Sequence, residues 1–352
     1  MANLANNKLK LLKGTNISHW LSQSDARGEE RRKRFTAEDV KYLADFGFDH
    51  LRLPVDEEQM WDDDFKKNNE AWDLLHEGIE WCRNADLKVV VDLHVLRCHH
   101  FNGENGENTL FTDPAKKLHF TECWRQLSGE LSRYGNDFLA YELMNEAVAD
   151  DPSDWNRVLL APYRVIREKE PLRYIAIGSN RWCQAQTFPQ LEVPLGDTRI
   201  ILVVHYYNPM LITHYRASWT ASIRDYSGPI TYPGIPVSEK SLSVLDSELR
   251  QRVSEQNKYY DVSVMEKDLF PAIKKSKDLN LPLWCNEFGV NRMAPDEIRE
   301  AWYRDFLSVL DKNSIGWANW DFRGSFGIID YQTGRETIVA KVLSENIRNT
   351  RK

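Results

Sequence analysis

Short apolar runs alternate with amphipathic stretches from one end of the chain to the other. Eight runs rich in β-branched residues are expected to be strands: Leu11–Ile17, His50–Pro54, Lys88–His94, Phe138–Met144, Tyr174–Ile177, Ile200–His205, Leu283–Cys285 and Ile315–Trp320. Between them, apolar positions recur at helical spacing, most clearly in Ala37–Phe46, Trp72–Cys82 and Trp302–Leu310. Near-continuous apolar strands separated by helices indicate a parallel sheet that is covered on both faces.

The number of strand–helix units indicates whether this sheet is open or closes into a barrel. About eight units in one domain-sized chain favour a closed barrel over an open doubly wound sheet, and no GxGxxG motif follows the first strand. We therefore predict an α/β protein with a single (β/α)8 barrel, the TIM-barrel architecture, in which residues 1–352 form one domain.

One connection is too long for an ordinary barrel loop. From Pro209 to about Phe270, some sixty residues follow the sixth strand, where about two to six are usual. Within it, Leu242–Tyr259 has a helical pattern and Tyr226–Pro236 is rich in Gly, Pro and Tyr. We expect residues 209–268 to form a small inserted subdomain over the barrel mouth. The alternative is an external decoration with no catalytic role.

Composition and charge exclude several classes of partner. The chain has 352 residues, of which 42% are hydrophobic and 28% charged, and its net charge is −7. No cluster of Lys and Arg supplies a nucleic-acid surface, and no apolar run approaches the length of a membrane span. We expect neither a nucleic acid nor a membrane as a partner, and we expect a monomer.

The cysteines and the N-terminal residues bear on the compartment. The five cysteines are odd in number and none form a CxxC pair, so neither a disulfide framework nor a zinc site is predicted: Cys82, Cys98, Cys123, Cys183 and Cys285. The first residues, MANLANNKLKLLKG, have no apolar core long enough for a secretion signal. The compartment stays open: extracellular if a signal was trimmed, cytoplasmic otherwise.

In a (β/α)8 barrel, residues at the carboxyl ends of the strands build the active site. Six of the eight predicted strand ends carry groups that hydrogen-bond, transfer protons or stack on sugars: Arg52, His94, Asn145 with Glu146, His205 with Tyr207, Glu287, and Trp320. The chain also has twelve tryptophans, and flat rings suit the apolar faces of sugars. Together these features favour a carbohydrate-processing site.

Two glutamates dominate this set. Glu146 and Glu287 each follow an asparagine at a strand end, on strands expected to face each other across the barrel mouth. Glycoside cleavage needs such a pair, because one carboxyl protonates the leaving oxygen and the other attacks the anomeric carbon or activates water. A nearby Arg52 would keep Glu287 ionised, while a drier position would raise the pKa of Glu146 so that it holds its proton.

The neighbouring groups have expected roles of their own. The Tyr207 hydroxyl is expected to donate to the ionised carboxylate, and Asn145 to bind the 2-hydroxyl of the sugar. His94 and His205 suit hydroxyl binding and a network around the carboxylates. Trp320 is expected to form the floor beneath the sugar to be cleaved.

At these residues the sequence resembles glycoside hydrolase family 5, and most of all the clostridial endoglucanase C type of that family. The likeness runs through nearly the whole chain and includes KGTNISHWLSQS, FGFDHLRLPVD, TLFTDPAKKLHFTECWRQL, HYYNP and NEFGV. The resemblance implies Glu146 as acid/base and Glu287 as nucleophile, with Arg52, His94, Asn145, His205, Tyr207 and Trp320 completing the site. It also implies a retaining endo-β-glucanase that cuts β-1,4 bonds in cellulose-type or mixed-linkage β-1,3-1,4-glucans without a cofactor.

Some positions depart from the family or are less distinctive. Many relatives have two consecutive histidines after the third strand, whereas His94 is followed by Val95; His99 or His100 could compensate. Further subsites are expected at four residues that follow the first and fifth strands: His19, Trp20, Arg181 and Trp182. For the tryptophans, packing in the core is an equally good interpretation.

Several other functions are compatible with parts of the pattern. Within the family, the runner-up is an endo-β-mannanase, followed by enzymes that act on xylan, xyloglucan or β-1,3-glucan. A metal-dependent sugar-processing barrel enzyme could use His and Glu at strand ends as ligands, and a non-catalytic glycan-binding barrel is a third class. The segment His99–Thr109 lacks the ligand spacing of an EF-hand, so we expect a mobile loop there and no metal.

Overall fold

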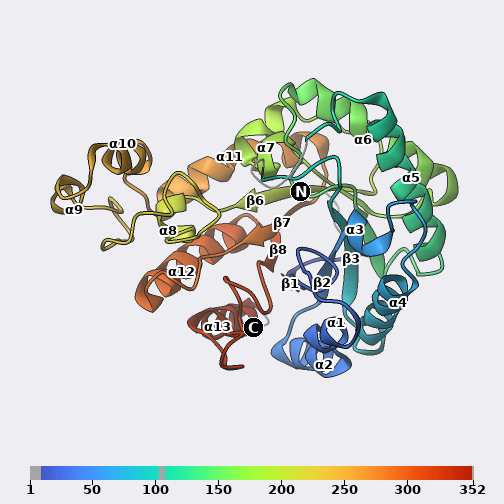
Figure 1. Ribbon diagram of the computed structural model, residues 1–352, viewed down its shortest axis with the longest axis horizontal. Helices are drawn as coiled ribbons and strands as arrows, with labels where there is room; N and C mark the ends of the chain where they lie inside the picture. The colour runs from blue at the N-terminus through green and yellow to red at the C-terminus, as the bar shows by residue number, and fades with distance from the viewer. Residues whose placement is uncertain (1–8, 103–107, 351–352) are drawn as a thin grey trace.

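The computed structural model describes residues 9–102 and 108–350, and its strands form a closed parallel barrel (Figure 1). The eight strands follow one another around the barrel in chain order: β1 Lys13–Asn16, β2 His50–Asp56, β3 Lys88–Val95, β4 Leu139–Glu142, β5 Ile175–Gly178, β6 Ile200–Tyr206, β7 Leu283–Phe288 and β8 Gly316–Asn319. Each lies within or overlaps a run that the sequence predicts to be a strand. The predicted (β/α)8 fold is therefore confirmed.

The long amphipathic helices surround the barrel, as the sequence pattern predicts (Figure 1). The helices of the described residues are α1 Gly28–Arg34, α2 Ala37–Phe46, α3 Glu57–Met60, α4 Asn69–Asn84, α5 Pro114–Leu131, α6 Pro152–Lys169, α7 Asn180–Cys183, α8 Met210–Thr213, α9 Glu239–Ser243, α10 Ser247–Gln256, α11 Val262–Leu279, α12 Asp296–Lys312 and α13 Ile338–Thr350. Local chemistry sets their ends. In α2, Thr36 and Asp39 form a capping box, and Gly47 ends the helix with a left-handed φ of 107°.

The register of the strands determines which side chains meet at the mouth. β1 closes the barrel against β8 by pairing Lys13 with Trp317. Between β6 and β7 the register shifts after Val204, and the shift brings His205 opposite Glu287. Such irregularities re-aim side chains beside active sites.

The long connection between β6 and α11 runs from residue 207 to residue 261 and has two parts. Its first part contains α8, and its second contains α9 and α10, which extend away from the barrel in Figure 1. The helical pattern predicted over Leu242–Tyr259 contains α10, which begins only after Asp246, because the Asp246 side chain accepts hydrogen bonds from Glu248 N and Leu249 N.

Other expectations concern the cysteines and the membrane. All five cysteines are buried and unpaired with one another. Within the described ranges, no helix combines the length and the apolar character needed to cross a membrane. The N-terminal residues 1–8 and the middle of the predicted His99–Thr109 loop lie outside the described residues.

Candidate active site

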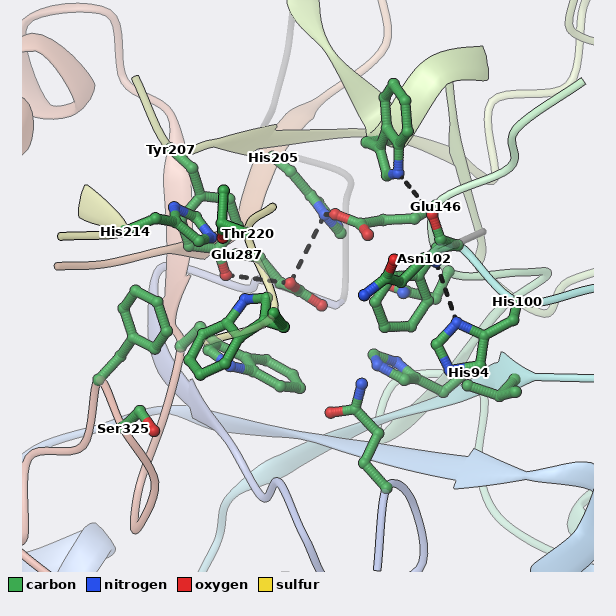
Figure 2. A pocket seen from close by; sticks show the side chains of 18 of the residues that line it. His94, His100, Asn102, Glu146, His205, Tyr207, His214, Thr220, Glu287 and Ser325 are labelled. Atoms are coloured by element: carbon green, nitrogen blue, oxygen red, sulfur yellow. Dashed lines mark hydrogen bonds and ion pairs between the residues drawn. The ribbon is translucent and has the colours of Figure 1, made fainter. Parts of the chain in front are cut away.

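A cavity of about 970 Å³ opens at the carboxyl ends of the strands, where the barrel fold places active sites (Figure 2). Nine of the twelve residues expected at the site line it: His19, His94, Asn145, Glu146, Trp182, His205, Tyr207, Glu287 and Trp320. Arg52 lies beneath the cavity floor and contacts Glu287. Trp20 and Arg181 are the two that the structure does not bring to the cavity.

The two glutamates lie close together in this cavity. Glu146 follows β4, Glu287 lies in β7, and both side chains are buried. One oxygen of each lies within 4.8 Å of the other, and His205 lies between them (Figure 2). Retaining glycosidases hold their carboxyls about 5–5.5 Å apart, whereas inverting enzymes need about 6.5–9.5 Å to admit water. The spacing fits the retaining geometry.

Glu287 is held by a cation and by a hydroxyl. Arg52 Nη1 donates to its Oε1 at 2.6 Å, and the Tyr207 hydroxyl donates to its Oε2 at 3.1 Å. Burial raises the pKa of Glu287, while His205 and Arg52 act in the opposite direction. These contacts stabilise the ionised form that a nucleophile requires.

Glu146 has a different environment. Among the residues that the structure describes, no Lys or Arg forms an ion pair with its carboxyl group, and its Oε1 lies 2.8 Å from His205 Nδ1. Burial raises the pKa of Glu146 to about 8, with Arg52 opposing the shift. Burial also lowers the pKa of His205, so this histidine is neutral near pH 7. The proton of the pair therefore resides on Glu146, the arrangement expected of a general acid.

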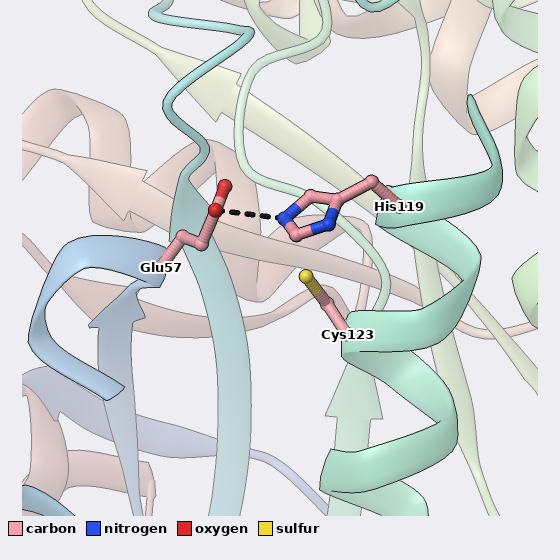
Figure 3. Close-up of side chains that lie close together, drawn as sticks. All are labelled: Glu57, His119 and Cys123. Carbon is pink, nitrogen blue, oxygen red and sulfur yellow. Dashed lines mark hydrogen bonds and ion pairs between the residues drawn. The ribbon is translucent and has the colours of Figure 1, made fainter. Parts of the chain in front are cut away.

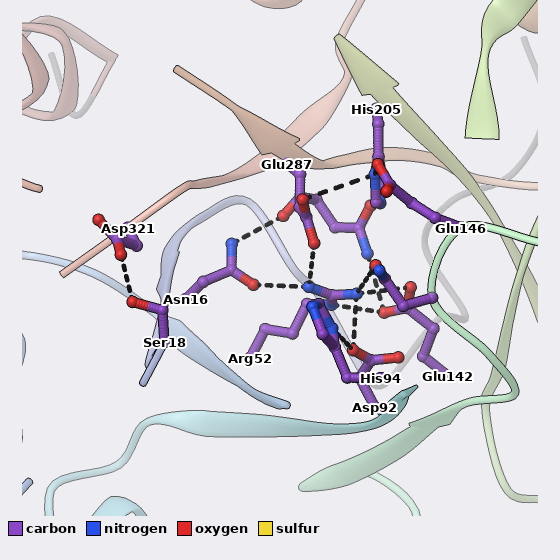
Figure 4. A network of polar contacts seen from close by, with 12 residues as sticks. Asn16, Ser18, Arg52, Asp92, His94, Glu142, Glu146, His205, Glu287 and Asp321 are labelled. Carbon is purple, nitrogen blue, oxygen red and sulfur yellow. Dashed lines mark hydrogen bonds and ion pairs between the residues drawn. The ribbon is translucent and has the colours of Figure 1, made fainter. Parts of the chain in front are cut away.

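Arg52 is the centre of a buried network that the sequence did not reveal (Figure 4). Besides Glu287, its guanidinium contacts Glu142 through two bonds of 2.7 and 3.0 Å and Asp92 at 2.8 Å. It also donates to Asn16 and Asn145, each through its Oδ1. Burial raises the pKa of Asp92 to about 7 and also raises that of Glu142. One guanidinium thus holds three carboxyl groups under the site.

The groups expected to touch the sugar are arranged around the two glutamates. His94 lies 2.7 Å from Asp92 through Nδ1 and stacks on Trp320, with ring centroids 5.5 Å apart and planes 3° apart. Burial lowers the pKa of His94 far below its usual range, so the ring is neutral. Asn145 gives its oxygen to Arg52, and among the described residues its Nδ2 has no partner. That amide is available to a sugar hydroxyl.

The four expected outer subsites divide into two pairs. His19 and Trp182 line the cavity, and Trp182 is 37% exposed, as a platform for a sugar must be. Trp20 is fully buried and packs against Phe35, so the subsite expected there is wrong and the core interpretation is right. Arg181 does not line the cavity; it is partly exposed and lies 3.8 Å from Asp150, so the outer subsite expected there stays a prediction.

The structure separates the two candidate histidines after the third strand and adds lining residues that sequence reasoning missed. His100 does line the cavity, whereas His99 is buried and accepts a hydrogen bond from Val148 N instead. Trp219 and Phe326 also line the cavity, from the β6–α11 connection and from the loop after β8. Neither lies at a strand end, so only the high aromatic content hinted at them.

Two groups of described residues have donor atoms close enough to share a metal ion: Glu146, His205 and Glu287, and Glu57, His119 and Cys123. In the first group Arg52 already supplies a positive charge to Glu287. In the second (Figure 3), Glu57 lies 2.7 Å from both His119 Nε2 and Arg97 Nη1. Burial raises the pKa of the Cys123 thiol far above its usual range, so it stays protonated. The second group therefore fits an ion-pair cluster that links α3 to α5.

A parallel barrel with two buried glutamates this close, in a cavity lined by aromatic rings, defines a glycoside hydrolase of the two-carboxylate class. Comparison with protein families agrees, since residues 11–325 match the family model described as "Cellulase (glycosyl hydrolase family 5)". The chain belongs to glycoside hydrolase family 5, as its sequence resemblance predicts.

Curated relatives and solved structures extend this comparison. Endoglucanase C of Acetivibrio thermocellus is 31% identical over 317 residues, which cover 88% of this chain and 90% of the relative. Cellodextrinase A of Ruminococcus flavefaciens is 29% identical, with 87% and 83% covered. The structure of Thermotoga maritima Cel5A with mannotriose has a TM-score of 0.76 at 23% identity, over 97% of this chain and 98% of that one. At this identity the structural likeness supports the fold alone.

Proposed function

We propose that the protein is a retaining endo-β-glucanase that hydrolyses β-1,4-glucosidic bonds in cellulose-type or mixed-linkage β-1,3-1,4-glucans. The observation that carries the proposal is the pair of buried glutamate oxygens within 4.8 Å, with Arg52 bound to only one of the two carboxyls. Family membership and the similarity to endoglucanase C over nearly the whole chain support the substrate class.

The proposed reaction is a double displacement. Glu287 attacks the anomeric carbon and forms a glycosyl ester, while Glu146 donates its proton to the departing glycosidic oxygen. Glu146 then takes a proton from water, the water oxygen attacks the same carbon, and Glu287 is released as a carboxylate. Two inversions leave the configuration unchanged. Asn145 holds the 2-hydroxyl, and Trp320 with the stacked His94 supports the ring.

The aromatic rings that line the cavity support a polymeric substrate. Partly exposed rings stand apart from the catalytic pair: Trp182 after β5, and Trp219, 42% exposed, in the β6–α11 connection. Such rings offer flat apolar surfaces to sugars on either side of the cleaved bond. We propose that the first part of the inserted segment contributes to substrate binding. Among the described lining residues, none favours mannan, xylan, xyloglucan or β-1,3-glucan over β-1,4-glucan.

Product analysis on barley β-glucan tests the proposal. NMR of freshly released anomeric signals should give short β-linked oligosaccharides with retained configuration from the wild type. Glu287→Ala should lower the rate by a factor on the order of a thousand or more, while the exposed Glu192→Ala behaves like the wild type. Inverted products would contradict the assigned roles, and equal or faster cleavage of glucomannan would contradict the glucanase assignment.

A chelator tests the metal-dependent alternative. Arg52 already supplies the positive charge at the catalytic pair, so EDTA should leave the rate on barley β-glucan unchanged. Loss of activity in EDTA that added metal restores would favour the metal-dependent class instead.

A further inference from the structure

Tyr207 needs contacts from outside the barrel strands to keep its position. Its hydroxyl donates to Glu287 Oε2 at 3.1 Å. The register pairs between β6 and β7 end with Tyr206 and Phe288, one residue before Tyr207, so this tyrosine already belongs to the β6–α11 connection. Residues of connections are more mobile than those of strands. Other contacts must therefore fix Tyr207 if its hydroxyl is to stay on the carboxylate.

Thr213, the last residue of α8, binds the backbone of Tyr207. Its hydroxyl donates to Tyr207 O, and the other acceptor within reach, Pro209 O, lies at 3.4 Å. The carbonyl of Thr213 accepts a hydrogen bond of 2.8 Å from Asn291 N, and Asn291 follows the strand that carries Glu287. Thr213 thus links the segment of Tyr207 to the segment that follows Glu287.

His214, the next residue, contacts the ring of the same tyrosine. The two rings meet edge to face, with centroids 5.2 Å apart and planes at 74° (Figure 2). Burial lowers the pKa of His214 to about 4, so its ring is neutral near pH 7 and has one N–H. Its Nδ1 lies 3.0 Å from Thr213 Oγ1, whose proton is directed to Tyr207 O. With the proton on Nδ1, His214 donates to Thr213 and Thr213 donates to Tyr207.

Thr213 differs from its neighbours in its access to the cavity. Tyr207 and His214 line the cavity, whereas Thr213 is not among the lining residues and is fully buried. A substitution at Thr213 therefore changes no group that a substrate touches. Any effect on the reaction must pass through the residues that Thr213 binds.

We propose that Thr213 is a positioning residue, which holds Tyr207 so that its hydroxyl donates to the nucleophile Glu287. This inference rests on the proposed function, because that function assigns Glu287 as the nucleophile. A hydrogen bond donated to a carboxylate favours its ionised form. If Tyr207 moves away, the pKa of Glu287 rises, and a protonated carboxyl group cannot attack the anomeric carbon. Activity should then be lost at a higher pH than in the wild type.

The acidic limb of the pH–rate profile tests the inference. The leaving group of 2,4-dinitrophenyl β-cellobioside departs without an acid, so the acidic limb of kcat/KM on this substrate reports the ionisation of Glu287 in the free enzyme. Thr213→Val removes the hydroxyl and keeps the branched shape of the side chain. We expect the midpoint of the acidic limb to rise by roughly half to one pH unit. On the limb itself, kcat/KM should be about three- to tenfold lower than in the wild type.

Matched variants separate positioning from the loss of a hydrogen bond in general. Thr213→Ser keeps the hydroxyl, so its midpoint should stay within about 0.2 pH unit of the wild type. Thr121→Val removes a hydroxyl that donates to Lys117 O at 2.9 Å within α5. It should leave the midpoint unchanged, whatever it does to the stability of the fold.

Tyr207→Phe decides whether the effect passes through the tyrosine hydroxyl. This substitution alone should raise the midpoint at least as much as Thr213→Val does, because it removes the donor itself. Combining it with Thr213→Val should then raise the midpoint little further, since the hydroxyl to be positioned is already gone. Such non-additivity is the sign of two residues that act through one interaction.

Several outcomes would overturn the inference. One is an unmoved midpoint in Thr213→Val or in Tyr207→Phe, and another is a pair of shifts that add in the double variant. If Thr213→Val does not fold, Thr213→Ala, which also lacks the hydroxyl, decides by the same midpoint. If neither folds, the bond serves the fold and the inference is overturned as well. Failure of the wild type on barley β-glucan would instead contradict the proposed function.

Discussion

Arg52 shows how much of the site depends on one side chain. It is fully buried and contacts the carboxyl groups of Asp92, Glu142 and Glu287 at 2.6 to 3.0 Å. A planar guanidinium can reach several carboxylates at once, whereas the point charge of a lysine cannot. The arginine that favours ionised Glu287 also compensates the charges of the acids below it, so the proposed catalysis and the fold depend on the same bonds.

Arg52→Met should therefore destabilise the fold in a pH-dependent way. Removing one partner from a buried ion cluster costs about 3–5 kcal/mol. Without the cation, the folded-state pKa values of the three acids rise further. A carboxyl group whose pKa is raised in the folded state stabilises the fold at low pH, and this stability is lost as the pH rises and the group ionises. Urea unfolding should show the largest loss at pH 8 and a partial recovery at pH 5. The exposed Arg125→Met is the control, and a loss independent of pH would contradict this account.

Glu146→Gln tests the protonation state of the candidate acid. Because burial raises the pKa of Glu146 from 4.5 to about 8, the wild type loses stability as pH rises through this range and the acid ionises. Glutamine does not ionise, so it carries no such loss. The unfolding midpoint of the variant should therefore rise relative to that of the wild type as the pH is raised from 5 to 8.5, while the variant is nearly inactive. The wild-type kcat/KM on barley β-glucan should fall above about pH 8 for the same reason. A constant difference in midpoint would mean that Glu146 is ionised at neutral pH.

At the scale of elements, the sequence predicts where the strands lie in the chain better than it predicts which side chains of neighbouring strands meet. Near-continuous apolar runs located all eight strands, and the barrel topology then put the strand-end residues at one mouth. Asp92 and Glu142 lie within such runs, and they meet because they are register partners between β3 and β4. The register of parallel strands depends on packing around the whole barrel, so no local sequence pattern predicts it.

Tryptophans near strand ends were ambiguous for a related reason. Trp20 and Trp182 look alike in sequence, but the first packs in the core under α1 and α4 and the second lines the cavity. Burial of a large ring depends on elements that are distant in the chain. The left-handed turn at 181–183 was equally hidden, because it contains none of the glycines that usually mark such conformations.

The β6–α11 connection should affect binding of polymers through its first part only. Trp219 lines the cavity, whereas Val244, at the end of α9, is not among the lining residues. Trp219→Ala should raise KM on barley β-glucan by about three- to tenfold through loss of ring stacking, with kcat on 2,4-dinitrophenyl β-cellobioside unchanged. Val244→Ser should match the wild type on both substrates. Equal effects of the two substitutions would mean that the connection acts only on stability.

At the scale of the whole molecule, closure of the barrel couples stability to the geometry of the site. An apolar layer that includes Val90, Val203 and Trp284 fills the barrel, and the polar network around Arg52 lies at its carboxyl end. Because β1 pairs with both β2 and β8, a change at the seam reaches the strands that carry Arg52 and Glu287. The monomer expected from the sequence stays a prediction, which sedimentation of the purified protein would check.

Gly316→Ala tests this coupling at the seam between β8 and β1. A Cβ at residue 316 would overlap the backbone oxygen of Leu11, which cannot rotate away as the tip of a side chain could. The strands must therefore separate beside the Trp317 N–H to Leu12 O bond of 2.9 Å, and we expect a loss of about 3 kcal/mol or more in the free energy of unfolding. Since the displacement passes along β8 to Trp320, kcat/KM on barley β-glucan should fall with it, even well below the unfolding temperature.

Gly129→Ala is the matched control: it lies in α5 with no atom within 4 Å of the added Cβ and should raise stability by about 0.5–1 kcal/mol. If Gly316→Ala has the same free energy of unfolding as the wild type but has lost activity, then the seam positions the site without contributing to stability. If Gly316→Ala has lost stability but retains its kcat/KM, then the geometry of the active site does not depend on the packing of the β8–β1 seam.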